Sequence, residues 1–185
     1  NGSLTIEAGG IVNADPGSQL SLNNTGLVWS NHGTFNASNS HITFTNPNAT
    51  INGTTNFYDV TIGSGAALLM TTGTMMRIAG SIVNNGTWNA GLLDNTVEYN
   101  GNNQQIISPN GTGTGYQNLI VSGTGVSTLP ASLNILQDLT INGDINTAGS
   151  TITMKGDENQ SIAGSAPLAF ENLTITNTGS TVMLT

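Results

Sequence analysis

The stretch Phe57-Tyr58-Asp59-Val60-Thr61-Ile62 decides the fold class, because aliphatic and polar residues alternate in it directly after an aromatic pair. Alternation with a period of two is typical of a β-strand that buries one face. Similar short runs occur along the whole chain, at Leu4–Ile6, Ile42–Phe44, Val97–Tyr99, Leu119–Val121, Leu139–Ile141, Ile152–Met154 and Leu173–Ile175. The sequence contains no window with helical spacing of apolar residues. We therefore predict an all-β chain of short strands and turns.

The opening stretch recurs twice further along the chain. Its pattern, an aromatic residue, any residue, Asp or Asn, and an aliphatic-x-aliphatic triplet, returns in residues 116–121 and 170–175. The run that begins at Ile42 also recurs at Val97 and Ile152, with a spacing of 55 residues in both cases. Recurrence at a fixed spacing indicates a repeat architecture.

We divide the chain into repeat units of about 55 residues on this basis. Residues 1–40 are the end of a preceding unit, 41–95 and 96–150 are two complete units, and 151–185 form an incomplete third unit. Both ends of the chain then fall inside a unit. A chain that begins and ends partway through a unit is expected for a segment of a longer array of repeats. It is also expected for a subunit that stacks head to tail through a heterologous contact.

Strands this short, without crossover helices between them, can wind as the coils of a parallel β-solenoid. Coils of roughly 18 to 20 residues would place about three coils in each unit and about nine or ten in the chain. We expect this parallel β-solenoid (β-helix). The alternative is a β-sandwich with Greek-key turns.

Charged residues are scarce, because 2 basic and 10 acidic residues give a formal net charge of −8 in 185 residues. Asn, Thr, Ser and Gly together make up half of the chain. Two basic residues cannot neutralise the phosphates of a nucleic acid, and the acidic balance disfavours binding to an anionic membrane surface. The longest apolar run, Ala66–Met70, is too short to cross a membrane. We expect no nucleic-acid partner and no membrane insertion.

Candidate catalytic and metal-binding groups are few and scattered. His32 and His41 stand nine residues apart in a chain without cysteine, so we expect exposed polar residues rather than a metal site. No pair of carboxylates stands out as a glycosidase pair, although a solenoid could align Glu98 with Lys155 or Asp157. We predict no enzyme activity, no catalytic residue, and no cofactor or metal site.

Nine Asn-x-Ser/Thr sequons make N-glycosylation a compositional candidate. One begins at Asn1, and the other acceptor residues are Asn23, Asn36, Asn48, Asn52, Asn85, Asn110, Asn159 and Asn172. About six sequons are expected by chance from this composition, so the excess is slight. A second recurring set is aromatic, and we expect it to pack in the core rather than to form an exposed stacking platform for sugars: Phe35, Phe57, Trp88, Tyr116 and Phe170.

The order of motifs within a unit is T-[IV]-x-[FYM], Q-x-I, [FY]-x-N-L-[TI]-[IV] and L-T-I-x-G. The Q-x-I element stands at Gln104-Gln105-Ile106 and at Gln160-Ser161-Ile162. This order resembles the repeats of large secreted, adhesin-like surface proteins of Bacteroidetes, clearly from about His41 onward. The resemblance implies export to the cell surface and a role in adhesion, gliding or surface coating.

We therefore expect an extracellular, cell-surface repeat region that is structural or adhesive and acts as a stiff stalk or surface filament. The alternatives are a self-assembling subunit that stacks head to tail, and a β-helix that binds or modifies carbohydrates. The expected partners are further repeats of the same chain or identical subunits end to end, together with glycans.

Overall fold

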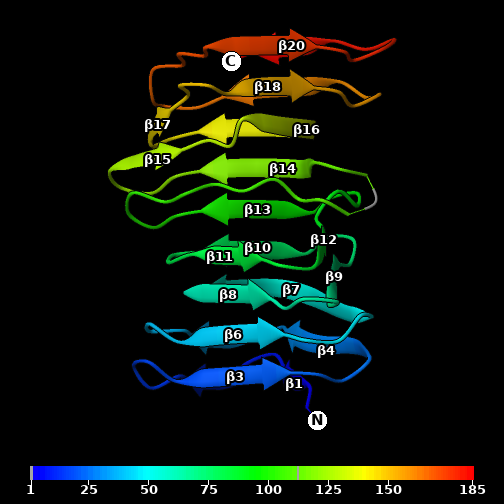
Figure 1. Cartoon of the computed structure of the whole chain (residues 1–185), viewed down its shortest axis with the longest axis vertical. Coiled ribbons are helices and arrows are strands. Elements are labelled where there is room, and N and C mark those ends of the chain that lie inside the picture. Colours follow the sequence, from blue (N-terminus) through cyan, green and yellow to red (C-terminus); the bar gives the residue numbers. More distant parts are fainter. Residues whose placement is uncertain (1, 112) are drawn as a thin grey trace.

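The computed structural model describes residues 2–111 and 113–185, which form a parallel β-solenoid of about nine turns (Figure 1). Every strand pair in these residues is parallel, which excludes the β-sandwich. One turn, or rung, passes over three faces of the solenoid, and every strand pairs with a strand in a neighbouring rung. The prediction of an all-β solenoid is confirmed.

The strands are grouped by face. The first face holds β1 (Leu4–Ile6), β4 (Gly26–Asn31), the first half of β7 (Ala49–Phe57), β9 (Ala67–Met70), β12 (Thr87–Asn89), the first half of β16 (Ser132–Ile141), β18 (Thr151–Met154) and β20 (Asn172–Ile175). The second face holds β2 (Ile11–Asn13), β5 (Thr34–Asn36), the second half of β7, β10 (Met75–Ile78), β13 (Thr96–Tyr99), β14 (Tyr116–Val121), the second half of β16, β19 (Gln160–Ala163) and β21 (Val182–Leu184). The third face holds β3 (Gln19–Leu22), β6 (His41–Phe44), β8 (Asp59–Ile62), β11 (Ile82–Asn84), β15 (Val126–Thr128) and β17 (Asp144–Asn146).

The structural repeat is the single rung of about 21 residues. Paired residues are between 18 positions apart, as for Ile42 with Val60, and 25 positions apart, as for Leu4 with Trp29. The predicted 55-residue unit is therefore wrong as a structural repeat. The pairing also runs on across the sequence division at residues 41, 96 and 151, because β6, β13 and β18 each pair with strands on both sides.

The 55-residue recurrence has a geometric cause. Ile42 lies in β6 on the third face, Val97 in β13 on the second face, and Ile152 in β18 on the first face. A spacing of 55 residues is roughly two and two-thirds rungs, so each recurrence falls one face earlier. All three faces use the same alternation of buried and outward residues. Similar sequences therefore recur without stacking on one another.

The stack twists along its long axis (Figure 1). Strands β3, β6 and β8 of the third face lie toward the viewer near the N-terminal end. Strands β18 and β20 of the first face lie toward the viewer at the C-terminal end. Such a twist is the ordinary consequence of the right-handed twist of β-strands.

The core is a column of apolar side chains inside the three faces. In strands such as β6, β8 and β13, buried and partly exposed residues alternate strictly, as the sequence predicted. Aromatic rings pack edge to face within the column, with ring centroids 4.9 Å apart for Trp29 and Phe35 and 5.6 Å apart for Trp88 and Tyr116. The predicted core positions of Phe35, Phe57, Trp88 and Tyr116 are buried, and Phe170 packs against the core in a partly buried position.

Glycine is required at a corner where successive rungs approach each other closely. Strand β7 bends from the first face to the second at Gly53, where φ is 80°. A Cβ atom on Gly53 would lie 1.9 Å from the carbonyl oxygen of Asn31 in the rung before it. No other residue type fits this corner without displacing the backbone.

The two Q-x-I motifs form the same buried corner at two places in the stack. The side-chain nitrogen of Gln104 donates to the carbonyl oxygens of Ile78 and Gly80 in the preceding rung, at 2.9 and 2.7 Å, and its oxygen accepts from the Gly101 nitrogen at 2.6 Å. Gln160 repeats these contacts with the carbonyl oxygens of Ile135 and Gln137 and with the Gly156 nitrogen. Both glutamines are buried, so each one replaces the water that would otherwise solvate these backbone groups.

Replacing Gln104 by Ala should destabilise the solenoid by about 3 kcal/mol, because one buried and two partly buried backbone groups lose their hydrogen-bond partner. The exposed neighbour Gln105 is the matched control, and Gln105→Ala should cost less than about 1 kcal/mol. Urea unfolding followed by circular dichroism measures both values. Equal losses in the two variants would contradict the role given to the buried glutamine.

Candidate functional site

A polar groove of about 490 Å³ lies at the corner between the first and second faces. It extends over four successive rungs, so it is about 14 Å long at the usual spacing of β-strands. Its lining is three carboxylates, four amides and one apolar side chain: Asp94, Asp138, Glu158, Gln117, Asn118, Gln137, Asn159 and Leu93. We call this set the corner groove. The set includes neither Arg77 nor Lys155, so the groove carries an uncompensated negative charge.

Hydrogen bonds between rungs hold the floor of the corner groove in place. Asn118 accepts from the Asp138 nitrogen at 3.3 Å and donates to the Asn95 carbonyl oxygen at 2.9 Å. One carboxylate oxygen of Asp138 accepts from the backbone nitrogen and the hydroxyl of Ser161, at 2.8 and 2.9 Å. Asn159 accepts from the Thr181 nitrogen at 3.0 Å. These side chains are therefore positioned by the stack itself.

Three side chains of the corner groove are uncommitted. Asp94 and Glu158 are exposed, and neither carboxylate makes a hydrogen bond or ion pair with any described residue. Gln117 differs because only 8% of its surface is exposed, and its amide also has no hydrogen-bond partner among the described residues. The side chain of Gln117 is thus held in place while its amide is free to bond to a polar ligand in the groove.

The groove is not predicted by the sequence motifs, although they contain part of its signal. Asn118 occupies the Asp-or-Asn position of the recurring aromatic motif, and Asp59 at the equivalent position likewise accepts from the Ser81 backbone nitrogen, at 2.7 Å. The recurring polar residue therefore marks a contact between rungs. Gln117 faces the groove because the register of β14 shifts between Tyr116 and Asn118, and no sequence pattern predicted this irregularity.

Apolar side chains are exposed at the C-terminal end of the stack. A cavity of about 250 Å³ opens there, and its lining is Ile162, Leu173, Ile175, Val182 and Leu184. Ile175 is 50% exposed and Leu184 is 69% exposed, although both belong to strands of the last rung. No described residue lies beyond β20 and β21 to cover these side chains.

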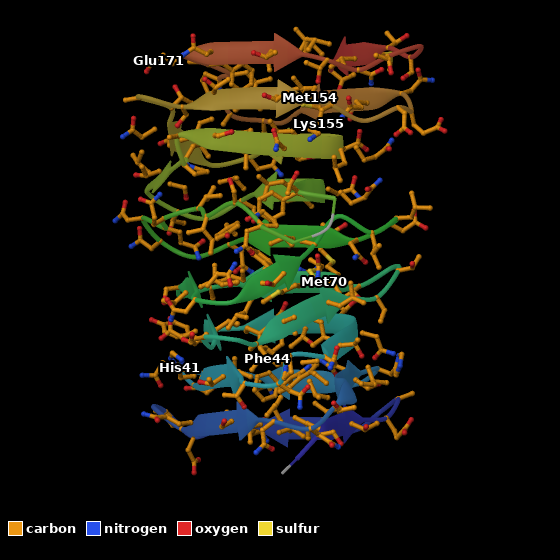
Figure 2. All side chains as sticks on the ribbon, turned by 45° about the vertical axis from the view of Figure 1, so that its right-hand side comes forward. His41, Phe44, Met70, Met154, Lys155 and Glu171 are labelled. Carbon is orange, nitrogen blue, oxygen red and sulfur yellow. The ribbon has the colours of Figure 1, made fainter. Side chains whose placement is uncertain are left out.

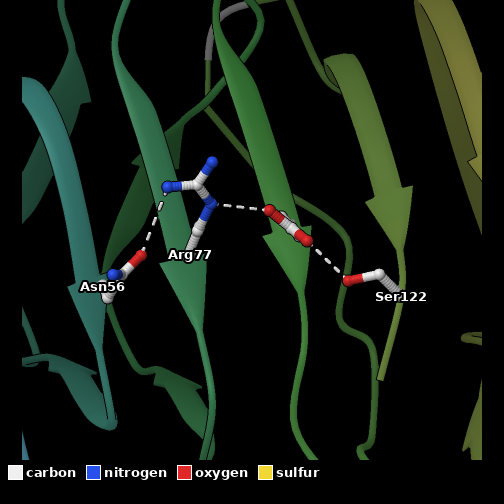
Figure 3. Close-up of polar contacts among 4 residues, drawn as sticks. Asn56, Arg77 and Ser122 are labelled. Carbon is white, nitrogen blue, oxygen red and sulfur yellow. Dashed lines mark hydrogen bonds and ion pairs between the residues drawn. The ribbon is translucent and has the colours of Figure 1, made fainter. Parts of the chain in front are cut away.

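The outer surface of the second face carries the one ion pair of the described residues (Figure 3). Arg77 in β10 contacts Glu98 in the next rung, with 2.7 Å between Nε and Oε2, and also approaches Asn56 in the rung before. Ser122 donates to the other oxygen of Glu98 at 2.5 Å. Half-exposed ion pairs of this kind contribute about 1 kcal/mol or less. The polar contacts of Arg77 therefore lie within the sheet.

The remaining candidate residues do not come together. His41 bonds to Thr61 at 2.8 Å and lies on β6 near the N-terminal end, whereas Lys155 lies in the upper part of the stack (Figure 2). Glu98 pairs in register with Arg77 and Ile120, so it is not aligned with Lys155 or Asp157. No group of three or more His, Cys, Asp or Glu side chains in residues 2–111 and 113–185 is arranged to hold a metal ion.

The sequons differ in whether the side-chain amide of the acceptor asparagine makes hydrogen bonds within the protein. Asn36 donates to Asn13, Asn110 to the Gly86 carbonyl oxygen and Asn172 to the Ser150 carbonyl oxygen. The exposed amide nitrogens of Asn48, Asn85 and Asn159 donate to no described group. Asn23 is exposed and makes a contact within the protein, and Asn52 has a buried side-chain oxygen without a partner in the described part of the chain. Asn1 lies outside the described residues, and glycosylation stays a prediction.

Comparison with protein-family models, with curated proteins and with solved structures gives no match. The resemblance to adhesin-like repeats therefore stays a prediction from the sequence motifs. Within the described residues there is also no helix with the length and apolar character needed to span a membrane.

Two tyrosines form a buried polar pair in the core beside the corner groove. The hydroxyl groups of Tyr99 and Tyr116 lie 3.0 Å apart, and the Tyr116 hydroxyl donates to the Ile107 carbonyl oxygen. Burial raises the pKa of Tyr99 to about 12 and raises the pKa of Tyr116 well above its usual value of 10. Both phenols are therefore neutral hydrogen-bonding groups in the folded protein.

The raised pKa values predict a loss of stability at alkaline pH. Above pH 10 the unfolded chain releases the Tyr99 proton while the folded chain keeps it, so the free energy of unfolding falls as the pH rises toward 12. The loss from Tyr99 is roughly 2 kcal/mol at pH 12, and Tyr116 adds to it. Urea unfolding between pH 9 and 12 measures the slope. A Tyr99→Phe/Tyr116→Phe variant should show a much flatter slope, and an unchanged slope would contradict the assignment.

Proposed function

We propose that this chain is an extracellular structural rod of the cell surface, acting as a stiff stalk or filament segment that presents an adhesive polar surface. The observation that carries the proposal is the pairing of each rung with the next through backbone ladders and corner side chains. Stacks of this kind are stabilised mainly between nearest neighbours and resist bending because many ladders would have to stretch at once.

The uncharged polar groups on the outer surface support a role in contacts with other molecules outside the cell. Outward positions of the third face stack Ser21, Thr43 and Thr61 in successive rungs. Uncharged hydroxyl and amide groups can form hydrogen bonds between rungs without the repulsion that like charges would suffer at this spacing. The proposal assigns no catalytic residue and no cofactor.

The cellular location is tested on intact cells of the source organism. An antibody raised against the purified rod should label intact cells as strongly as permeabilised cells, because the proposal places the rod outside. A cytoplasmic protein detected in parallel should need permeabilisation. Labelling of the rod that also needs permeabilisation would contradict the extracellular role.

A second candidate is a subunit that stacks head to tail with identical copies, and the direction of the strands favours it. All strand pairs of the described residues are parallel, so β20 and β21 run in the same direction as β1 and β2. A second copy in this arrangement would cover Leu184 and its neighbours and continue the ladders. The chain's net charge of −8 opposes this contact, so association should strengthen as salt screens the charge.

Leu184→Asn should lower the end-to-end association constant by about tenfold or more, because burying one leucine contributes about 2 kcal/mol. Leu93→Asn is the matched control, because Leu93 is 68% exposed and lies on the side of the rod rather than at its end. Sedimentation velocity over a concentration series at low and high salt measures the association. A monomer at all concentrations, or equal effects of the two variants, would exclude head-to-tail stacking.

A further inference from the structure

We propose that the corner groove binds an uncharged oligosaccharide, held by the amide of Gln117 and the carboxylates of Asp94 and Glu158. The inference goes beyond the structural role, because a stiff rod needs no ligand site. It rests on the dimensions of the groove, on its charge and on the side chain of Gln117, which is 8% exposed and whose amide has no partner among the described residues.

The dimensions of the groove suit a short, elongated molecule. Its volume of about 490 Å³ lies within the usual range of small-ligand sites. The length of about 14 Å over four rungs is greater than a single ion or water molecule can fill. Because the hydrogen bonds of Asn118 and Asp138 fix its floor, the groove is formed before a ligand arrives.

The charge of the groove excludes an anionic ligand. Asp94, Asp138 and Glu158 line it, and neither Arg77 nor Lys155 is among the lining residues. A phosphate, a nucleic acid or a uronic-acid polymer would therefore meet repulsion along the whole groove. A single metal ion is also disfavoured, because no group of three or more His, Cys, Asp or Glu side chains in residues 2–111 and 113–185 is arranged to hold one.

The hydrogen-bonding groups of the groove fit hydroxyl groups. Uncommitted carboxylates of Asp94 and Glu158 can only accept hydrogen bonds, whereas the amide of Gln117 can donate two and accept others. A sugar hydroxyl both donates and accepts, so neighbouring hydroxyls can satisfy both kinds of group at once. Hydrogen bonds from hydroxyls to carboxylates are charge-assisted and roughly twice as strong as neutral ones.

Gln117 gives the site its strongest expected contact. Only 8% of its surface is exposed, so its neighbours hold the side chain in place, while its amide atoms keep access to the groove. A ligand hydroxyl in the groove can therefore bond to an amide that has no competing partner among the described residues. The exposed carboxylates of Asp94 and Glu158 would act as weaker contacts at either end of the groove.

The test uses isothermal titration calorimetry with the whole chain. The probes are neutral tetrasaccharides of glucose, mannose, galactose and xylose, with a galacturonic-acid tetrasaccharide and calcium chloride as the charged comparisons. We expect saturable binding of at least one neutral tetrasaccharide and no binding of the galacturonic-acid tetrasaccharide. Binding of calcium alone, equal binding of the anionic sugar, or binding of none of the neutral sugars would overturn the proposal.

Two groove variants and one control locate the binding. Asp94→Asn/Glu158→Gln removes two exposed charges and should weaken binding of the neutral sugar about tenfold, and Gln117→Leu should weaken it at least as much. Asp144→Asn/Asp157→Asn makes the same change in net charge at exposed residues outside the groove and should leave binding unchanged. If Gln117→Leu fails to fold, the Asp94 and Glu158 double variant still decides. Equal effects of the two double variants would overturn the assignment to the groove, and the surface location of the rod is measured separately.

Discussion

Successive rungs of the solenoid meet through parallel backbone hydrogen bonds, and this contact limits what each position of the sequence can hold. Equivalent residues lie about 4.8 Å apart in neighbouring rungs, so an inward side chain must pack against the side chains directly above and below it. At the corners the backbone turns away from the ladder, and side chains complete the bonding between rungs. Asx side chains that accept a backbone N–H from another rung recur along the stack: Asp59 from Ser81, Asn103 from Val126, Asn118 from Asp138, Asp138 from Ser161, Asn142 from Ser165 and Asn159 from Thr181.

The scarcity of charge follows from the same contact. Like charges at equivalent positions would repel one another in every rung, whereas Asn, Thr and Ser can form hydrogen bonds at this spacing. Charge is accommodated where opposite signs are neighbours in the ladder, as for Arg77 and Glu98 on the second face. The corner groove is the exception, because three carboxylates gather there without a basic residue. The corner groove departs from this scarcity of charge, and it is therefore also the best candidate for a binding function.

The sequence was sufficient for the strands and the core but not for the repeat or the groove. Period-two alternation places Val60, Val97 and Leu139 in strands with buried side chains, because burial of one face is a local property of the pattern. The length of a rung is not local, since it depends on which face each strand joins. The segments that recur every 55 residues therefore share the same alternation of buried and outward residues but lie on different faces. The groove residues come from four rungs, so a rung length of about 21 residues was needed to bring Gln117 and Glu158 together.

Residues that are neighbours in space are one rung, and not 55 residues, apart in sequence. The chain has no cysteine, so pairs of introduced cysteines test this claim without background. Ser21 and Thr43 are register partners on the third face, and a Ser21→Cys/Thr43→Cys variant should form an intramolecular disulfide on mild oxidation, because neighbouring strands bring the two Cα atoms within bonding range. Thr43 and Glu98 are 55 residues apart on different faces, so a Thr43→Cys/Glu98→Cys variant should keep two free thiols. Crosslinking of the second pair, with free thiols in the first, would contradict the account.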